Sequence, residues 1–325
     1  MTESVSVALA ACRGGRHLEQ QLRSLAGQSR RVDEVVICDD SPDDATGAVA
    51  AECRKRLALD IRYERNMERL GVAGNFAKAV SLCRGDIIFL CDQDDFWLPG
   101  KVEKMLGALA GAPDASGVFC DSRLADENLN ELDGTLWRVR GFTAARQKRF
   151  AEAPQLPQLL QRVRLSTHNI AFRAAMRQYL LPFPEMPGLY PDTWIAQMLS
   201  ASGGRWLALP ECLTLYRLHG ANLSRPGDTG LFARIGAARR GLRNGHLTGR
   251  RMIAEALLER LPRQAENNRP LLERYLAFCR ARESLSPRFC KRLFAALRLW
   301  GRGDYRRFDR CWRTLAVDLF LRGQH

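Results

Sequence analysis

One stretch, residues 85–101 with the sequence GDIIFLCDQDDFWLPGK, restricts the possible folds of this chain more than any other. Residues 87–91 form a short apolar run of the length expected for a buried strand. Three carboxylates follow within four positions, those of Asp92, Asp94 and Asp95. Neighbouring like charges raise one another's pKa, and a divalent cation with oxygen ligands, Mg²⁺ or Mn²⁺, relieves the repulsion. The alternative is an Asp-rich surface turn, or an N-cap cluster for the helix expected after Pro99.

The segments before this stretch alternate between strand and helix patterns. Strands are predicted at residues 5–11, 35–38 and 61–63, and helices at 18–25, 45–56 and 76–83. The short connections favour an α/β fold with a mainly parallel central sheet flanked by helices. Ligands of such sheets bind at the carboxyl ends of the strands. Two predicted strands end there in acidic pairs, Asp39 with Asp40 and Asp92 with Asp94, so we expect a ligand at this edge.

A series of motifs resembles one known family. The motifs are LAACRGGRHLEQQLRSLAGQS, EVVICDDSPDDAT, RNMERLGVAGNFAKAV, GDIIFLCDQDDFWLPGKVEKM, PDTWIAQM and LYRLHGANLS. Spread over residues 4–225, they are similar to the inverting glycosyltransferases of family 2, and within that family to the rhamnosyltransferase-like branch that builds bacterial surface polysaccharides. The resemblance implies a GT-A (Rossmann-like) fold, a nucleotide-diphosphate sugar donor, a divalent cation and single-displacement chemistry.

The resemblance also implies roles for individual residues. Asp94 would hold the metal that bridges the donor diphosphate, and His219 would complete the metal sphere. Asp39 would read the nucleobase, and Asp92 would face the ribose. The other donor-binding residues that it implies are Ala10, Ala11, Arg13, Asp40, Asn66, Gly71, Asn75, Gln93, Asp95 and Arg217. After the first strand this chain has Ala-Cys-Arg, where the family usually has Thr-Tyr-Asn.

Asp192 is the candidate catalytic residue. Pro191 and Asp192 begin a predicted helix, which places Asp192 at or near its N-cap, and a cap needs no further function. The resemblance implies instead that Asp192 is the general base that takes the proton of the acceptor hydroxyl. The sequence alone leaves both interpretations open.

Two further segments, residues 126–156 and 166–172, lie between these motifs. Residues 126–156 have no clear period and many charges, which indicates a long loop near the acceptor. Residues 166–172 predict a strand. The resemblance implies that its His168 and Asn169 enter the site, and the alternative for His168 is a purely structural histidine.

The positive charge of the chain lies almost entirely at its C-terminal end. The net charge is +14, and residues 228–325 contain 22 Lys plus Arg against 9 Asp plus Glu. We therefore expect a catalytic domain at 1–227 and a basic, amphipathic helical region at 228–325. Such helices suit an anionic membrane surface, or they pack on the body as a subdomain. Nucleic acid is a weaker alternative, because no recognition motif accompanies the charge.

The remaining features concern location and function. The N-terminus shows no secretory signal, and no apolar run approaches the roughly 18 residues of a spanning helix. The 10 cysteines are scattered singly, as expected for free thiols in a cytoplasm. We expect a metal-dependent inverting glycosyltransferase, peripheral on the inner face of the plasma membrane, that acts on a cell-surface polysaccharide or lipid-linked glycan. The alternatives are a nucleotidyltransferase on a sugar phosphate and a noncatalytic binding protein of the same fold.

Overall fold

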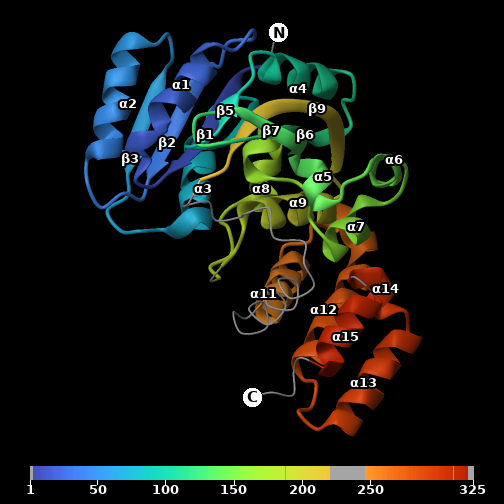
Figure 1. Ribbon diagram of the computed structural model, residues 1–325. Helices are drawn as coiled ribbons and strands as arrows, with labels where there is room; N and C mark the ends of the chain where they lie inside the picture. Colours follow the sequence, from blue (N-terminus) through green and yellow to red (C-terminus); the bar gives the residue numbers. More distant parts are fainter. Residues whose placement is uncertain (1–2, 187, 220–245, 310, 321–325) are drawn as a thin grey trace.

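The computed structural model describes residues 3–186, 188–219, 246–309 and 311–320 (Figure 1). Within these residues a sheet of nine strands lies between helices, and a group of C-terminal helices extends from one side. The strand order is β3-β2-β1-β4-β8-β6-β9-β5, and β7 pairs with β6. The predicted α/β class, with a central sheet flanked by helices and a C-terminal helical extension, is confirmed.

The first half of the sheet is parallel, as predicted. Its elements are β1 (Val5–Ala11), α1 (Leu18–Ala26), β2 (Glu34–Asp39), α2 (Ala45–Arg56), β3 (Ile61–Arg65), α3 (Gly71–Leu82) and β4 (Ile87–Asp92). Along β4, Ile88 and Leu90 belong to one apolar core, and Ile87, Phe89 and Cys91 belong to another. Successive side chains of a strand point to opposite faces, so β4 is covered on both faces. This double burial explains its uninterrupted apolar run.

The second half of the sheet mixes parallel and antiparallel pairs. Its elements are β5 (Phe96–Trp97), α4 (Lys101–Ala110), β6 (Ala115–Ala125), β7 (Glu131–Thr135), β8 (Ile170–Arg173), α8 (Arg177–Leu180), α9 (Pro191–Ala201) and β9 (Arg205–Arg217). β8 pairs antiparallel with β4 and β6, whereas β6 and β9 are parallel. The strand expected at 166–172 begins only at Ile170, because residues Thr167–Asn169 form a 3₁₀ turn.

The strand β9 is longer than the sequence predicts. The mainly apolar runs at 206–209 and 213–216 each have the length of a short strand, but the structure has one curled strand, Arg205–Arg217 (Figure 1). Its register with β6 shifts near Cys120 and Asp121. Such an irregularity bends a strand without ending it, so the apolar pattern is interrupted while the strand continues.

The prediction of a long loop at residues 126–156 is wrong. The structure has β7, α5 (Leu136–Arg140) and α6 (Ala144–Glu152) there, and α7 (Gln155–Gln161) begins before the segment ends. Trp137, Phe142 and Phe150 are buried, and the rings of all three lie within 5.8 Å of the Phe119 ring. These helices are too short to show a helical period, and their positions depend on packing against Phe119 rather than on local sequence.

The C-terminal helices pack against one another and against the body. They are α11 (His246–Glu259), α12 (Arg269–Glu283), α13 (Phe289–Gly301), α14 (Asp304–Phe308) and α15 (Trp312–Phe320). Leu257 and Tyr275 belong to the same apolar core as Trp194 of α9. The predicted domain boundary at 227/228 and the helical pattern FARIGAARRGL lie outside the described residues.

Two further sequence predictions concern the whole chain. All ten cysteines are free thiols, and Cys38, Cys91 and Cys120 at the ends of apolar runs are buried, as predicted. Among the described residues, no helix has the length and apolar character needed to cross a membrane.

Candidate active site

The strand register brings the predicted residues of three strands to one edge. Ala11 of β1 is paired with Asp39 of β2, and Ala10 is paired with Asp92 of β4. These positions are the carboxyl ends of parallel strands, where α/β sheets bind ligands. The two acidic pairs that the sequence singles out therefore lie on either side of the end of β1.

The loop after β4 carries three carboxylates with different exposure. The side chains of Asp92 and Asp94 are 34% and 21% exposed, whereas that of Asp95 is 1% exposed. Burial raises the pKa of Asp92 to about 6, with the cation of Lys101 acting in the opposite direction. Burial and the charge of Asp92 also raise the pKa of Asp94. The carboxylates thus crowd one another, and a bound cation would lower all of these pKa values.

His219 lies beside Asp94, as the resemblance implies. Its Nε2 is 2.8 Å from Asp94 Oδ2, and the His219 ring is 5.3 Å from that of His17. An imidazole nitrogen and a carboxylate oxygen at this separation suit a shared divalent cation, and Mn²⁺ accepts such a mixed donor set. The last residues of the YRLHGAN motif, including Asn222, lie outside the described part of the chain.

A second group consists of Asp92 and the two buried residues Asp95 and His168. His168 Nδ1 is 3.2 Å from Asp95 Oδ2 and 3.5 Å from Asp92 Oδ2. Its ring stacks on Tyr216 with centroids 5.0 Å apart, and burial holds its pKa well below the usual value. Asp95 Oδ2 has no hydrogen-bond partner among the described residues, although it is fully buried. The ligand atoms of this group also lie close enough for one metal ion.

Arg217, one of the residues implied to bind the donor, lies buried at the end of β9. Only 1% of the residue is exposed, and its guanidinium donates hydrogen bonds to the Asp94 carbonyl at 2.7 Å and to Gln20 Oε1 at 2.8 Å. It also donates to the Glu127 carbonyl, and its backbone N–H donates to Asp95 Oδ1. In these contacts Arg217 fixes the acidic loop against the end of β9.

Lys101 is a site residue that the sequence analysis missed. Its side chain is fully buried, and Nζ donates to the His168 carbonyl at 2.6 Å and to Thr214 Oγ1 at 2.8 Å. The ammonium group also lies 4.1 Å from the centroid of the Trp97 ring. Burial lowers its pKa, while the charges of Asp95 and Asp92 act to raise it. The only signal in the sequence is its place six residues after Asp95, at the start of a helix.

Gln93 connects the acidic loop with the loop after β1. Its Oε1 accepts from the Cys12 N–H, and its Nε2 donates to the Cys12 carbonyl, both at 2.9 Å. A Cβ atom at Gly14 would lie 2.7 Å from Gln93 Oε1, so a larger residue there would have to displace the Gln93 amide. Arg13 has a left-handed backbone, with φ of 56°, and its N–H donates to Ser41 Oγ. The donor-side loop is therefore held by backbone contacts that do not depend on the Ala-Cys-Arg side chains.

Asp39 and Asp40, at the end of β2, belong to two different hydrogen-bond networks. Asp39 is fully buried and accepts from the Ser41 hydroxyl at 2.6 Å and the Tyr63 hydroxyl at 2.8 Å. Asp40 accepts from Asn66 Nδ2 at 2.6 Å. Asp39 thus lies below the surface of the edge, while Asp40 joins the loop that leads to α3.

The loop before α3 brings together the remaining predicted donor residues. Asn66 Nδ2 also donates to Asn75 Oδ1 at 2.9 Å, and Asn75 Nδ2 donates to the Ala11 carbonyl at 3.0 Å. Gly71, with φ of +73°, begins α3 five residues earlier than the sequence predicts for this helix. A positive φ favours glycine at this position, whatever space surrounds it.

Asp192 lies in the first turn of α9, but it does not cap that helix. The N-cap residue is Tyr190, Pro191 follows it, and no side chain accepts a capping hydrogen bond there. The Asp192 side chain is 16% exposed, and its Oδ2 is 4.0 Å from Arg140 on α5. Burial raises the pKa of Asp192, the Arg140 cation lowers it, and the charge of Asp92 adds to the rise. Asp192 thus lies near the N-cap, as predicted, but it is not the cap residue, and the general-base role stays a prediction.

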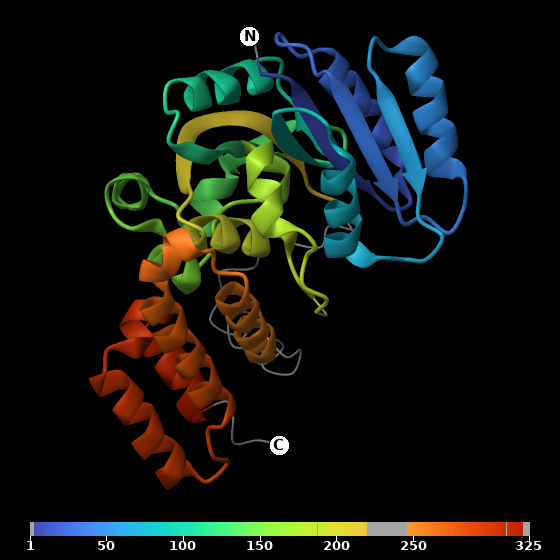
Figure 2. The same ribbon diagram turned by 180° about the vertical axis from the view of Figure 1, so that it is seen from behind.

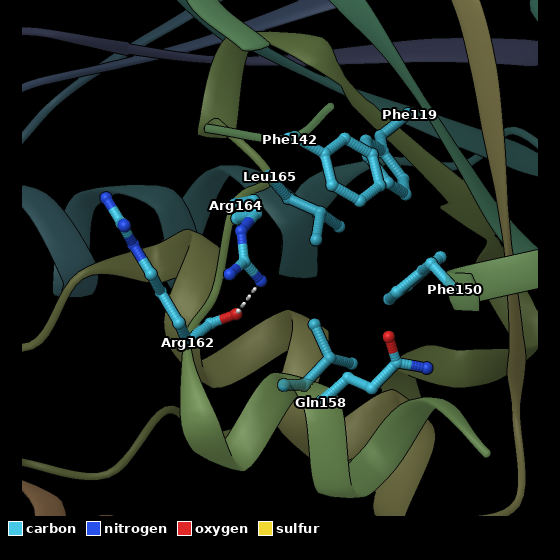
Figure 3. A pocket seen from close by; sticks show the side chains of 8 residues that line it. Phe119, Phe142, Phe150, Gln158, Arg162, Arg164 and Leu165 are labelled. Carbon is cyan, nitrogen blue, oxygen red and sulfur yellow. Dashed lines mark hydrogen bonds between the residues drawn. The ribbon is translucent and has the colours of Figure 1, made fainter. Parts of the chain in front are cut away.

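A small cavity lined by residues of β6, α6 and α7 contains none of the carboxylates. It is lined by Phe119, Phe142, Phe150, Gln158, Leu159, Arg162, Arg164 and Leu165, and Figure 3 shows the aromatic rings gathered on one side of it. Its volume of about 10 Å³ holds one water molecule at most. It belongs to the packing of the 126–156 segment and is too small for a sugar.

The sequence matches the profile of a known family. The profile described as "Glycosyl transferase family 2" aligns with residues 6–179, which is more than half of the chain. The chain belongs to glycosyl transferase family 2. The matched residues include β1, β2, β4 and the acidic loop, so the family assignment covers the edge described above.

Curated relatives of this family 2 protein align over part of their length. The uncharacterized protein Mb1547 of Mycobacterium bovis is 28% identical over 190 residues, which are 57% of this chain and 50% of that protein. The succinoglycan biosynthesis protein ExoO of Rhizobium meliloti is 27% identical over 233 residues, covering 68% of this chain and 62% of ExoO. The chain thus spans about half the length of Mb1547.

Solved structures similar to this family 2 chain share its fold. The mannosyltransferase PcManGT from Pyrobaculum calidifontis, in complex with GDP-Man and Mn²⁺, has a TM-score of 0.55 at 18% identity, covering 99% of this chain and 86% of that chain. S. aureus TarS 1–349 in complex with UDP-GlcNAc has a TM-score of 0.53 at 14% identity, covering 92% of each chain. These likenesses confirm the predicted GT-A fold.

Proposed function

We propose that this family 2 protein is a metal-dependent inverting glycosyltransferase that uses a nucleotide-diphosphate sugar. The observation that carries the proposal is the meeting of the acidic loop after β4 with the acidic end of β2 at the carboxyl edge of the parallel strands. Asp94 and His219 lie together at that loop, and the charge of Asp92 is close enough to raise the pKa of Asp192. A one-step displacement with inversion requires a general base separate from the donor-side acidic group, and we assign that role to Asp192.

The residues of the acidic loop fit Mg²⁺ or Mn²⁺. Asp94 and His219 offer a carboxylate and an imidazole that are both partly exposed, and the buried Asp95 Oδ2 has no hydrogen-bond partner among the described residues. We assign the metal to Asp94 and His219, because their side chains are 21% and 10% exposed and a diphosphate can reach them. Asp92, Asp95 and His168 are the alternative set. The Mn²⁺ in the PcManGT complex supports this assignment.

The bound cation would stabilise the negative charge of the leaving nucleotide diphosphate. Asp192 takes the proton of the acceptor hydroxyl as that oxygen forms a bond to the anomeric carbon. The bond from the anomeric carbon to the diphosphate breaks in the same step, so the configuration inverts. Gln93 and Arg217 hold the acidic loop in place from either side. The backbone at Ala10 and Ala11 lies between the two acidic strand ends, where it can contact the donor.

We further propose a bacterial surface glycan as the acceptor, either a polysaccharide or a glycan on a lipid carrier. The name of the relative ExoO, a succinoglycan biosynthesis protein, supports this class, and the sequence motifs favour the rhamnosyltransferase-like branch. In this proposal residues 1–227 form the catalytic domain. Residues 228–325 form a basic helical region that keeps the protein peripheral on the anionic inner face of the plasma membrane.

The proposal is tested by incubating the protein with UDP-, GDP- and dTDP-sugars, with Mn²⁺, Mg²⁺ or EDTA. We expect one donor to raise the melting temperature by mass action, and the same donor to release its nucleoside diphosphate in a metal-dependent way. Release of pyrophosphate from a nucleoside triphosphate and a sugar phosphate would indicate a nucleotidyltransferase instead. Donor binding without any transfer or hydrolysis would leave a noncatalytic binding protein.

A further inference from the structure

The helix α13 exposes large apolar side chains to solvent. Phe294 is 75% exposed, Leu297 51%, Phe289 46% and Trp300 39%. Phe320 at the end of α15 is 65% exposed, and its ring lies 6.3 Å from that of Phe289. We call these five residues the α13 face. A group of neighbouring large apolar side chains on a protein surface marks a site that interacts with another protein or with a membrane.

The α13 face is bordered by positive charge. The helix has the sequence FCKRLFAALRLWG, with no acidic residue, and Lys291 and Arg298 are exposed on it. Because successive residues of a helix are turned by 100°, Lys291 and Arg298 lie next to Phe294 on the helix surface, both on the same side of it. The acidic residue of α15, Asp318, is fully buried and bonded to Arg282. Among the described residues, the two helices of this face therefore present cations beside apolar groups and no exposed carboxylate.

The arginines of the neighbouring helices have another role. Arg282 bridges Asp318 and Asp309, Arg250 pairs with Asp309, and Arg251 pairs with Glu283. These guanidinium groups hold α11, α12 and α15 together. The basic residues of the helical region therefore include paired arginines inside the helix group as well as exposed cations on α13.

The position of α13 leaves its face accessible. Figures 1 and 2 show this helix at the outer end of the helix group, on the side away from the sheet. A flat surface can therefore meet α13 without contact with the sheet.

We propose that the α13 face is the membrane anchor of this protein, which inserts its aromatic and leucine side chains at the headgroup boundary of an anionic bilayer. Phe, Leu and Trp beside Lys and Arg on one helix are typical of helices that lie in the membrane interface. A second copy of the chain fits less well, because a two-fold contact through this face would bring Lys291 and Arg298 near their own copies. The proposal rests on the membrane-side function proposed above, and it assigns that function to α13.

The test uses the full-length protein and sedimentation with vesicles of neutral lipid, with or without about one-third anionic lipid. Phe294→Ser combined with Leu297→Ser should weaken binding to anionic vesicles at least about tenfold, because the inserted apolar area is lost. Lys291→Gln combined with Arg298→Gln should weaken it by about fivefold for each charge. Both pairs of side chains are exposed, so melting temperatures should stay at the wild-type value.

Matched controls lie elsewhere on the surface. Leu132→Ser removes an exposed leucine of β7, and Arg54→Gln with Lys55→Gln removes two exposed cations of α2, at the far end of the molecule from α13 (Figure 1). These variants should bind anionic vesicles within about twofold of wild type. Equal binding by the Phe294/Leu297 variant and wild type would overturn the proposal. The proposal would also be overturned if the wild-type protein were a dimer that does not bind vesicles and the Phe294/Leu297 variant were a monomer.

Failure of the anchor and failure of the proposed function give different results. Transfer to a short water-soluble acceptor needs no membrane, so the α13 variants should retain it at the wild-type rate if the enzymatic proposal holds. If no donor supports transfer while vesicle binding depends on the α13 face, the enzymatic proposal fails and the anchor remains.

Discussion

At the edge of the sheet, Asp92, Asp94 and Asp95 crowd within four positions, whereas the buried charges of the helical region are matched by opposite charges. Arg282 there donates to both oxygens of Asp318 at 2.6 and 3.1 Å, and Tyr305 donates to the same carboxylate. In the acidic loop, by contrast, the buried oxygen Asp95 Oδ2 has no hydrogen-bond partner among the described residues. Both regions bury charge, but only in the helical region does a buried arginine bond both oxygens of a buried carboxylate.

The directions of the pKa shifts express this difference. Burial would lower the pKa of Arg282, but the charge and hydrogen bonds of Asp318 outweigh it and raise that pKa, so the charged form is stabilised. At the sheet edge burial raises the pKa of Asp95 well above its usual value, and Asp94 and Asp92 add to the rise. The helical network is complete in the protein itself. In the acidic loop, an added positive charge would lower the raised pKa values of the carboxylates.

The largest expected effect is on catalysis and comes from Asp192→Asn. Asp192 makes no capping hydrogen bond, so the variant should fold and bind donor like wild type. Transfer at saturating donor and acceptor should fall about 10²–10⁴-fold, the usual contribution of a positioned general base. The measurement is the turnover rate, with a melting curve and donor-induced stabilisation as controls. Wild-type turnover would remove Asp192 from the mechanism.

The next largest effect tests the helical region. Arg282→Met leaves Asp318 and Asp309 buried without this partner, which should lower the free energy of unfolding by about 3–5 kcal/mol. Arg280→Ala, at the exposed pair with Glu255, is the matched control and should change it by at most about 1 kcal/mol. Urea unfolding measures both.

A double variant sharpens this test. Adding Asp318→Leu to Arg282→Met removes both partners of the ion pair and should recover part of the lost stability. Equal losses in Arg282→Met and Arg280→Ala would show that the buried network contributes no more than a surface pair.

The acidic loop should respond to cations, whereas the helical region should not. At Mn²⁺ concentrations about 100 times the dissociation constant, the free energy of unfolding should rise by about 2.7 kcal/mol. Asp94→Asn should abolish this rise, and Asp133→Asn, an exposed acidic residue of β7, should retain it. Differential scanning calorimetry with and without Mn²⁺ gives the values. An Asp94→Asn variant with full stabilisation would move the metal to Asp92, Asp95 and His168.

The smallest effect is a shift of the pH–rate profile. The Arg140 cation lowers the pKa of Asp192, so Arg140→Gln should raise that pKa. A general base must be deprotonated, and its activity is lost as the pH falls through its pKa. The acid limb of kcat/KM should therefore move to higher pH in Arg140→Gln and stay in place in Arg138→Gln, a variant of the exposed neighbour on α5. An unmoved limb in Arg140→Gln would remove Arg140 as a positioning residue for the base.

The sequence by itself determined the parallel half of the sheet and the edge where the acidic residues meet. An apolar run of five or six residues that ends in carboxylates constrains the chain locally, because it must be a buried strand whose end reaches solvent. β1, β2 and β4 are therefore predicted with nearly correct bounds. Parallel pairing then places Ala10, Asp39 and Asp92 at one edge.

Only the tertiary structure decided what lies beneath and beside that edge. Lys101 reaches the His168 carbonyl 67 residues away, and the Arg217 backbone reaches Asp95 across 122 residues. No local pattern encodes such contacts, because they depend on how β8 and β9 pack beside β4. The helices of residues 126–156 could not be predicted from the sequence either, because the packing of their aromatic side chains against Phe119 fixes their positions. The separation of paired from exposed arginines in the C-terminal helices has the same cause: composition gives the net charge, and packing decides which charges meet.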